Sequence, residues 1–273
     1  MRTPTALTIA GSDSGGGAGI QADLKAFARC GVHGTSAVTA ITAQNTVAVI
    51  AILPIDPAIV LAQVRAVIED IPPDAVKIGM LGTADVVLAV ASALELLPSG
   101  TPVVLDPVMV AESGAPLLDE AARGALIDHI LPRATVLTPN LPEARTLIGG
   151  SAIATEEEGE AEALARALLA LGPQAVVITG GHRERASDLF LARGGEDAPV
   201  SIDGERHPDG AAHGSGCTHS SVLAAQLALG RTPLQAARIA RSLTGVAVAA
   251  GLRDVGSGAG PVDVLGLAHL RES

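Results

Sequence analysis

The chain has 273 residues, a net charge of −11 and a pI near 5.0, and its only aromatic side chains are Phe27 and Phe190. The acidic charge argues against a protein that binds nucleic acid through a basic surface, and the absence of Trp and Tyr argues against base stacking. An acidic protein can still bind phosphates through backbone N–H groups and a metal ion. We therefore expect small-molecule ligands and no nucleic acid partner.

The cysteines and the apolar segments bear on the compartment. Cys30 and Cys217 are too few for a disulfide framework and lack the spacing of a metal site. The apolar run near the N-terminus is too short for a signal peptide. The longest apolar region, residues 47–68, is interrupted by prolines and charged side chains, so it does not predict a membrane span. We expect a cytoplasmic protein with no membrane association.

Short apolar runs alternate with longer amphipathic ones in the first half of the chain. Asp56 and Thr83 stand where helix N-caps are expected. The periodicity predicts these elements in chain order: a strand at 6–11, a helix at 20–30, strands at 36–42 and 47–53, a helix at 56–70, a strand at 75–81 and a helix at 83–97.

The second half continues the alternation and ends in helices. It predicts strands at 102–108 and 134–140 with a helix at 117–131 between them, a helix at 155–172, a strand at 175–181, a hairpin of 188–194 and 199–204, and helices at 217–230 and 233–250. Alternation of this kind implies a mostly parallel sheet covered on both faces, in one α/β domain spanning 1–273. The acidic run at 156–162 is expected in the solvated first turn of its helix.

The first strand leads into a glycine-rich stretch, "GSDSGGGAGIQAD". Neither phosphate-loop register fits, because Gly17 and Ala18 stand where a P-loop has Lys-Ser/Thr, and Ile20 stands where a dinucleotide fingerprint has its last glycine. The stretch is therefore expected to be a flexible loop that lets backbone approach a ligand, with a tight turn as the alternative. Asp23 follows one helical turn after Gly19 and either faces this loop or is a solvated helix residue.

Other candidate residues follow predicted strands, where ligands of parallel sheets bind. Gln44 offers an amide donor and acceptor for the edge of a heterocycle, and a turn role is the alternative. Met80 is either an apolar wall or a core residue. Asp106, Asn140 and Glu143 combine two acids with an amide, which suits Mg²⁺ bound together with nucleotide phosphates. A helix N-cap or first-turn acid is the alternative for each acid alone.

Two glycine-containing segments complete the pattern. In "ITGGH", residues 178–182, a glycine pair after a strand lets a nucleotide approach the backbone. In "HGSGC", residues 213–217, consecutive N–H groups at a helix N-terminus predict an anion hole. The helix dipole would lower the pKa of Cys217 there, and a small buried residue is the alternative.

Taken together, "GSDSGGGAGIQADLKAF", "TAQNT", "KIGML", "VLDPVM", "LTPNLPEA", "TGGH" and "HGSGC" resemble the hydroxymethylpyrimidine (phosphate) kinases of thiamine biosynthesis, which belong to the ribokinase-like superfamily. The resemblance runs from about residue 6 to "GAGPVD" at 258–263. It implies a ribokinase-like three-layer α/β/α sandwich with a mostly parallel central sheet. It also implies ATP and Mg²⁺ as cofactors and a homodimer.

The resemblance assigns expected roles to residues of this chain. The pyrimidine would be bound by Gly11, Ala18, Asp23, Gln44, Met80 and Val108. The metal would be held by Asp106 and Glu143, and ATP by Asn140, Thr179, Gly181, Arg183 and His213. The anion hole would be formed by Gly214, Ser215, Gly216 and Cys217, with Cys217 where related sugar kinases place an aspartate base.

One position departs from the resembling family. Many members carry a phosphate-contacting lysine where this chain has Thr179, and Arg183 is the candidate replacement from a different position. The alternatives for function are a pyridoxal kinase, which Gln44 and Met80 disfavour, and a catalytically weak ligand-binding relative. An oxidoreductase is disfavoured by the failed dinucleotide fingerprint.

Overall fold

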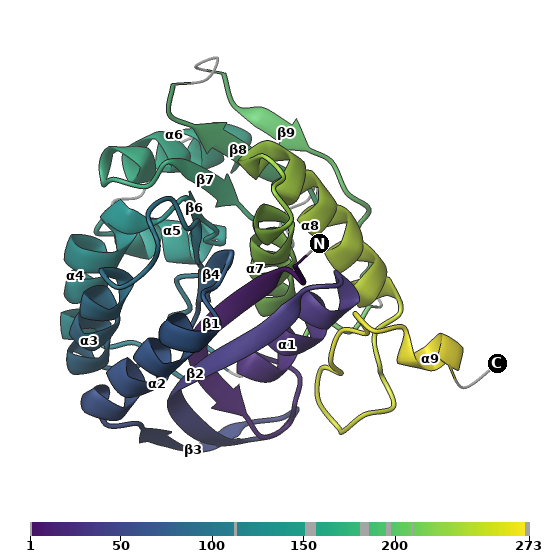
Figure 1. Ribbon diagram of the computed structural model, residues 1–273. Helices are drawn as coiled ribbons and strands as arrows, with labels where there is room; N and C mark the ends of the chain where they lie inside the picture. The colour runs from purple at the N-terminus through teal and green to yellow at the C-terminus, as the bar shows by residue number, and fades with distance from the viewer. Residues whose placement is uncertain are drawn as a thin grey trace.

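The computed structural model describes residues 2–111, 114–150, 157–180, 186–194, 198–208 and 210–270. Its centre is one nine-stranded sheet, with strand order β3-β2-β1-β4-β5-β6-β7-β8-β9 (Figure 1). The strands are β1 (Thr5–Asp13), β2 (His33–Gln44), β3 (Val49–Pro54), β4 (Ala75–Ile78), β5 (Val103–Leu105), β6 (Val136–Leu137), β7 (Ala175–Ile178), β8 (Asp188–Ala192) and β9 (Val200–Ile202).

The sheet is parallel in its middle and antiparallel at its two edges. The strands from β2 through β1 to β7 pair in parallel, whereas β3 pairs antiparallel to β2, and β8 and β9 form an antiparallel extension of β7. The parallel strands therefore all end at one edge of the sheet, and this edge is where ligands are expected to bind.

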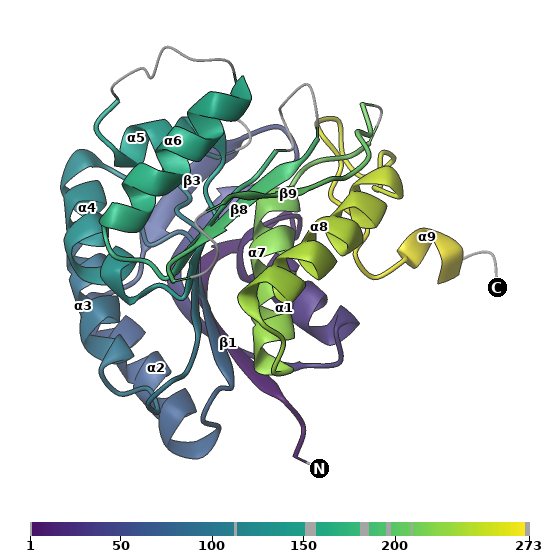
Figure 2. The ribbon, with the colours of Figure 1, turned by 90° about the horizontal axis from the view of Figure 1, so that it is seen from above.

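Helices cover both faces of the sheet (Figure 2). One side carries α2 (Pro57–Asp70), α3 (Ala84–Leu94), α4 (Glu120–Ala125), α5 (Leu141–Leu147) and α6 (Glu157–Ala170). The other carries α1 (Gly19–Arg29), α7 (Ser215–Ala228) and α8 (Pro233–Ala249), and a short α9 (Leu267–Leu270) lies near the C-terminus. This arrangement is the predicted three-layer sandwich. None of these helices, within the described ranges, is both long and apolar enough to cross a membrane.

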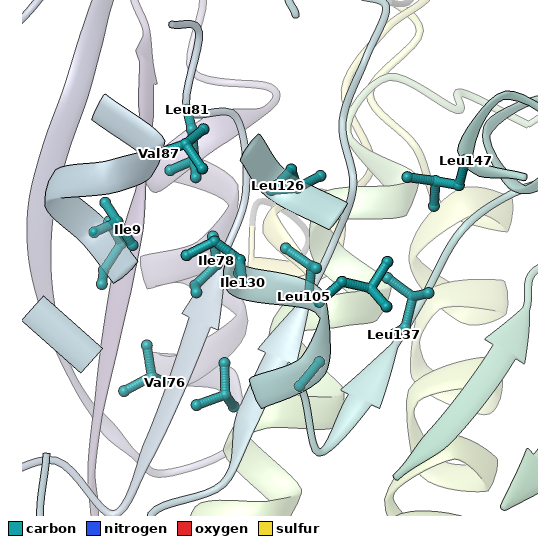
Figure 3. Close-up of a cluster of buried hydrophobic side chains, with 14 of the residues drawn as sticks. Ile9, Val76, Ile78, Leu81, Val87, Leu105, Leu126, Ile130, Leu137 and Leu147 are labelled. Carbon is teal, nitrogen blue, oxygen red and sulfur yellow. The ribbon is translucent and has the colours of Figure 1, made fainter. Parts of the chain in front are cut away.

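Successive strand residues face opposite helix layers, as the two-residue period of a strand requires. Figure 3 shows the larger apolar cluster, in which Ile9, Val76, Ile78 and Leu105 from the strands β1, β4 and β5 meet side chains of the covering helices such as Val87. The intervening strand residues face α1, α7 and α8, where small side chains dominate.

The expected elements are present, but β5 and β6 cover only part of the strands expected at 102–108 and 134–140, and the helices α5 and α9 were not predicted. Asp56 and Thr83 cap α2 and α3 as predicted. The helix expected at 117–131 is instead the short α4 followed by a π turn at Leu126–Ile130 and a 3₁₀ turn. Helix α7 begins at Ser215, two residues before the predicted start. In the acidic run, Glu160 is buried and accepts two hydrogen bonds from Arg145 at 2.7 and 2.6 Å, so this residue does not lie in a solvated turn.

Candidate active site

A cavity of about 410 Å³ opens at the carboxyl ends of the parallel strands. This volume is ordinary for a small-molecule site. Most of the residues selected from the sequence line it: Gly11, Ala18, Gln44, Met80, Asp106, Val108, Asn140, Glu143, Thr179, His213, Gly214, Ser215, Gly216 and Cys217. Gly181 and Arg183 lie outside the described residues. Asp23 does not line the cavity.

The glycine loop after β1 is held in place by Asp13. Its carboxylate accepts backbone hydrogen bonds from Gly15, Gly17 and Ala18 at 2.8, 3.0 and 2.9 Å, and His213 Nε2 lies 3.2 Å from Oδ2. Burial alone would raise the pKa of Asp13, but the hydrogen bonds from His213 and the loop hold it below its ordinary value. The loop is therefore fixed, rather than flexible as expected from its glycines.

The same loop packs directly against the segment before α7. A Cβ atom at Gly17 would lie 2.1 Å from Cδ2 of His213, and a Cβ atom at Gly214 would lie 1.8 Å from the carbonyl oxygen of Gly17. Gly214 has φ of 80°, a left-handed conformation that glycine adopts without strain. These glycines allow the first-strand loop and the helix terminus to form one continuous wall.

One end of the cavity combines apolar groups with an oriented amide. The Sδ atom of Met80 lies 3.1 Å from the position of a Cβ atom on Gly11, so the two residues form a contiguous surface. Thr42 donates to Oε1 of Gln44 at 3.1 Å, which orients the amide. Asn45, in contrast, accepts from Val47 and Ala48 and is a turn residue. This end therefore offers an apolar wall and an amide that can hydrogen-bond the edge of a heterocyclic ligand.

Asp106 and Glu143 contribute two carboxyl groups to the lining of the cavity. Asn140 and Glu143 form the capping box of α5, in which Glu143 accepts from the Asn140 N–H at 2.9 Å. Burial, and then the charge of Asp106, raise the pKa of Glu143 to about 8. Burial also raises the pKa of Asp106, although Lys77 and Ser220 oppose it. Glu143 therefore both caps α5 and contributes an acidic group to the cavity.

A divalent cation fits this pair of carboxyl groups. The charge of Asp106 raises the pKa of Glu143, and a cation bound by both carboxyl groups would stabilise their ionised forms. Mg²⁺ takes only one or two carboxylates and completes its shell with water and phosphate oxygens. Within the described ranges there is no cluster of three or more His, Cys, Asp or Glu side chains, as an all-protein metal cage would need.

The N-terminus of α7 presents backbone donors to the same cavity. The Ser215 N–H already donates to the Ala212 carbonyl at 2.9 Å, so the remaining first-turn donors are those of Gly216 and Cys217. Both residues line the cavity, and Gly216 is exposed in it. These amides form the predicted anion hole, except that the N–H of Ser215 is already used and does not contribute to it.

The thiol of Cys217 has a higher pKa than the sequence predicts. Burial raises the pKa of its thiol to about 12, and the carboxylates of Asp106 and Asp23 add to this, against the lowering effects of Lys77 and the Gly19 N–H. The expected lowering by the helix dipole is therefore outweighed. At neutral pH the free site holds a thiol, not a thiolate.

Three comparisons place this site in a known family. A profile of the phosphomethylpyrimidine kinase family matches residues 13–263. The chain belongs to this family. The hydroxymethylpyrimidine/phosphomethylpyrimidine kinase of Synechococcus elongatus is 45% identical over 264 residues, which are 96% of this chain and 97% of that protein. The resemblance noted from the sequence motifs is confirmed.

Solved structures agree with the fold of this kinase. The phosphomethylpyrimidine kinase of Clostridium difficile 630 has a TM-score of 0.75 and 38% identity, covering 87% of this chain and 96% of its own. A pyridoxal kinase of Bacillus subtilis, solved as an ADP complex, has a TM-score of 0.86 and 35% identity, covering 98% and 99%. The ribokinase-like fold predicted above is thus confirmed.

Asp23 requires a correction. Its carboxylate is fully buried and accepts from Lys77 Nζ at 3.0 and 3.1 Å and from the hydroxyls of Thr8 and Ser221 at 2.6 Å each. It is therefore a core residue of this kinase and has no surface with which to bind the pyrimidine. The hydrogen bonds of Asp23 therefore connect α1 to β1, β4 and α7.

Lys77 and Asp13 are site residues that the sequence patterns did not select. Lys77 is fully buried behind the cavity, and its Nζ lies 3.9 Å from Oδ2 of Asp106. Burial favours the neutral amine, but Asp23, Cys217 and Asp106 raise the pKa of Lys77 above its ordinary value, so it stays charged. A lysine at an inward position of the apolar strand "AVKI" was the available signal for this residue. For Asp13, the signal was an aspartate at the head of a glycine-rich turn.

Proposed function

We propose that this protein phosphorylates 4-amino-5-hydroxymethyl-2-methylpyrimidine with ATP and then phosphorylates the monophosphate to the diphosphate, in thiamine biosynthesis. The observation that carries the proposal is the set of groups that line one cavity. Apolar side chains and Gln44, the carboxyl groups of Asp106 and Glu143, and the free amides of Gly216 and Cys217 all face the same cavity. Membership of the family supports the same reaction.

At the substrate end, the roles follow from shape and hydrogen bonding. Gly11, Ala18, Met80 and Val108 would enclose the ring of the pyrimidine, and Gln44 would pair with its amino edge through an amide that offers both donor and acceptor. The fixed glycine loop would then hold the hydroxymethyl group toward the anion hole.

At the phosphate end, Asp106 and Glu143 would hold Mg²⁺, which neutralises charge on the phosphates of ATP. Asn140, Thr179 and His213 line the cavity and would contact the nucleotide, and Gly181 and Arg183 are further candidates for the same role. The amides of Gly216 and Cys217, with Gly214 and Ser215 shaping the turn, would stabilise negative charge that develops on the transferred phosphoryl group.

The test is ADP release from MgATP with hydroxymethylpyrimidine, its monophosphate or pyridoxal as acceptor. We expect turnover with the first two. Pyridoxal kinase activity is the second candidate, supported by the 35% identity to the Bacillus subtilis pyridoxal kinase. Turnover with pyridoxal alone would replace the main proposal by that candidate. Absence of turnover with all three would leave a ligand-binding relative.

Replacing Cys217 by Ala is expected to slow both phosphorylation steps by a similar factor. A protonated thiol cannot accept the hydroxyl proton, and phosphoryl transfer through a loose transition state requires little deprotonation of the nucleophile beforehand. Cys217 would then contribute its N–H and its packing. The measurement is kcat for each step with the two pyrimidine substrates. A selective loss of the first step would instead establish the thiol as the proton acceptor.

We also propose that the chain forms one kinase domain over 1–273, acts in the cytoplasm where ATP is supplied, and is a homodimer. The dimer proposal is supported by exposed apolar side chains on β2, β3, the turn between these strands and α2. They are Ile41, Val47, Ile50, Ile52, Leu53 and Ile59, which are 39–74% exposed. Light scattering should give twice the 27.2 kDa chain mass, and Ile50→Asp should give the monomer mass. A monomeric wild-type protein would refute the dimer.

A further inference from the structure

A second cluster of buried charged groups lies in the wall of the same cavity. It consists of Asp188 on β8, His219 on α7 and Arg241 on α8, whose residues are 2%, 4% and 9% exposed. His219 Nε2 lies 3.0 Å from Oδ2 of Asp188, and Arg241 Nε lies 3.9 Å from Oδ1. The cluster therefore places two basic side chains against one carboxylate.

Several polar atoms of this cluster lack hydrogen bonds. Within the described part of the chain, Nδ1 of His219, Nε of Arg241 and the hydroxyl of the neighbouring Thr244 have no hydrogen-bond partner, whereas Nε2 of His219 faces Oδ2 of Asp188. Buried polar groups are normally paired, because an unpaired one costs roughly 1–3 kcal/mol. Donors left unpaired at the wall of a cavity indicate that the ligand supplies their acceptors.

The position of the cluster identifies the part of the ligand that it meets. His219 lies one helical turn after Ser215, directly below the first-turn amides of α7. Asp188 accepts the N–H of Gly180 at 2.9 Å, and Gly180 follows the cavity residue Thr179. The cluster therefore lies between the anion hole and the end of β7, where phosphate groups of a nucleotide would pass.

The other buried basic groups of the described cavity wall already have acidic partners. Lys77 is held by Asp23, and the ring of His213 is next to Asp13. Arg241 donates to the carbonyls of Ala186 and Glu205, which leaves its charge in place. The nearest carboxylate to Arg241 in this cluster is Asp188, 3.9 Å from Nε, so the guanidinium charge is only loosely paired and can act on a phosphate group in the cavity.

We propose that His219 and Arg241 form a phosphate-binding centre for the nucleotide, with Asp188 as the residue that positions both. The inference rests on the proposed function, since it requires a nucleotide in this cavity. The centre would supply the charge that Thr179, with a neutral hydroxyl, cannot supply at the end of β7. Charge-assisted hydrogen bonds to phosphate oxygens would also satisfy the unpaired donors.

The test compares the binding of MgADP and of adenosine by calorimetry. His219→Gln keeps a donor toward Asp188 but removes the basic ring, so we expect affinity for MgADP to fall about tenfold while affinity for adenosine changes less than about twofold. His33→Gln, at an exposed position where β2 begins, is the matched control and should bind both ligands as the wild type does. An equal loss for both ligands, or no loss for MgADP, would overturn the proposal.

A second variant tests the same proposal in case His219→Gln fails to fold. Asp188→Asn combined with His219→Leu removes the basic ring without stranding a buried carboxylate, and the asparagine oxygen can still accept the Gly180 N–H. The same selective loss of MgADP affinity is expected, and equal affinities for wild type and double variant would refute the phosphate role. If the wild-type protein binds neither MgADP nor adenosine, the proposed function fails first. If the wild-type protein binds both ligands, the variants test the phosphate-binding role of His219 and Arg241 separately from the proposed function.

Discussion

Gly214→Ala should lower kcat for both phosphorylation steps by about 10²–10³-fold, the range expected when anion-hole donors are displaced. The added Cβ would lie 1.8 Å from the carbonyl oxygen of Gly17, and the residue would keep a left-handed φ of 80°. Relief of that contact has to move either the glycine loop or the start of α7, because His213 fills the space beside Gly17. Steady-state kinetics and a thermal melt measure the two consequences.

The control for Gly214→Ala is a neighbouring glycine with open space around it. A Cβ at Gly216 would meet no atom within 4 Å, so Gly216→Ala should leave the melting temperature unchanged. Gly214→Ala should lower it, since strain at a left-handed residue costs about 1–3 kcal/mol. Wild-type kcat and melting temperature in Gly214→Ala would contradict the close packing of the two segments.

Lys77→Met should destabilise the protein by about 3–5 kcal/mol, the cost of leaving one partner of a buried ion pair without the other. Asp23 would keep the hydroxyls of Thr8 and Ser221 but lose the ammonium group at 3.0 Å. Asp106 would also lose the cation 3.9 Å away, so activity should fall as well. Urea unfolding and kcat are the measurements.

The double variant Asp23→Asn/Lys77→Met separates the two effects. Replacement of both charges removes the stranded carboxylate of Asp23, so most of the lost stability should return, whereas activity should not, because the cation beside Asp106 is still missing. Arg65→Met, at an exposed position on α2, should change stability by no more than about 0.5 kcal/mol. A double variant as unstable as Lys77→Met would show that packing, not charge, explains the loss.

The sequence alone was sufficient for most of the fold because the relevant signals are local. Alternation of short apolar runs with amphipathic ones predicted the strands and helices, and the side chains of Asp56 and Thr83 cap the helices where expected. The helix expected at 117–131 was too long because nothing in its periodicity marks the π turn at Leu126–Ile130.

The sequence alone also selected much of the candidate site, for a topological reason. Parallel strands place their carboxyl ends on one edge, so Gln44, Asp106, Asn140 and Thr179 were expected together and do line one cavity. The glycines of "HGSGC" were likewise predicted at a helix terminus, because a short polar and glycine-rich segment before an apolar helix is a local pattern.

Only the tertiary structure decided which charges meet. Asp23 pairs with Lys77 across 54 residues of sequence, and Asp13 meets His213 across 200. The pKa of Cys217 shows the same dependence, because the local helix pattern predicted a lowered value, whereas burial and the carboxylates of Asp106 and Asp23 raise it. Desolvation and Coulomb interactions depend on distance in space, and the order of residues in the chain does not contain that distance.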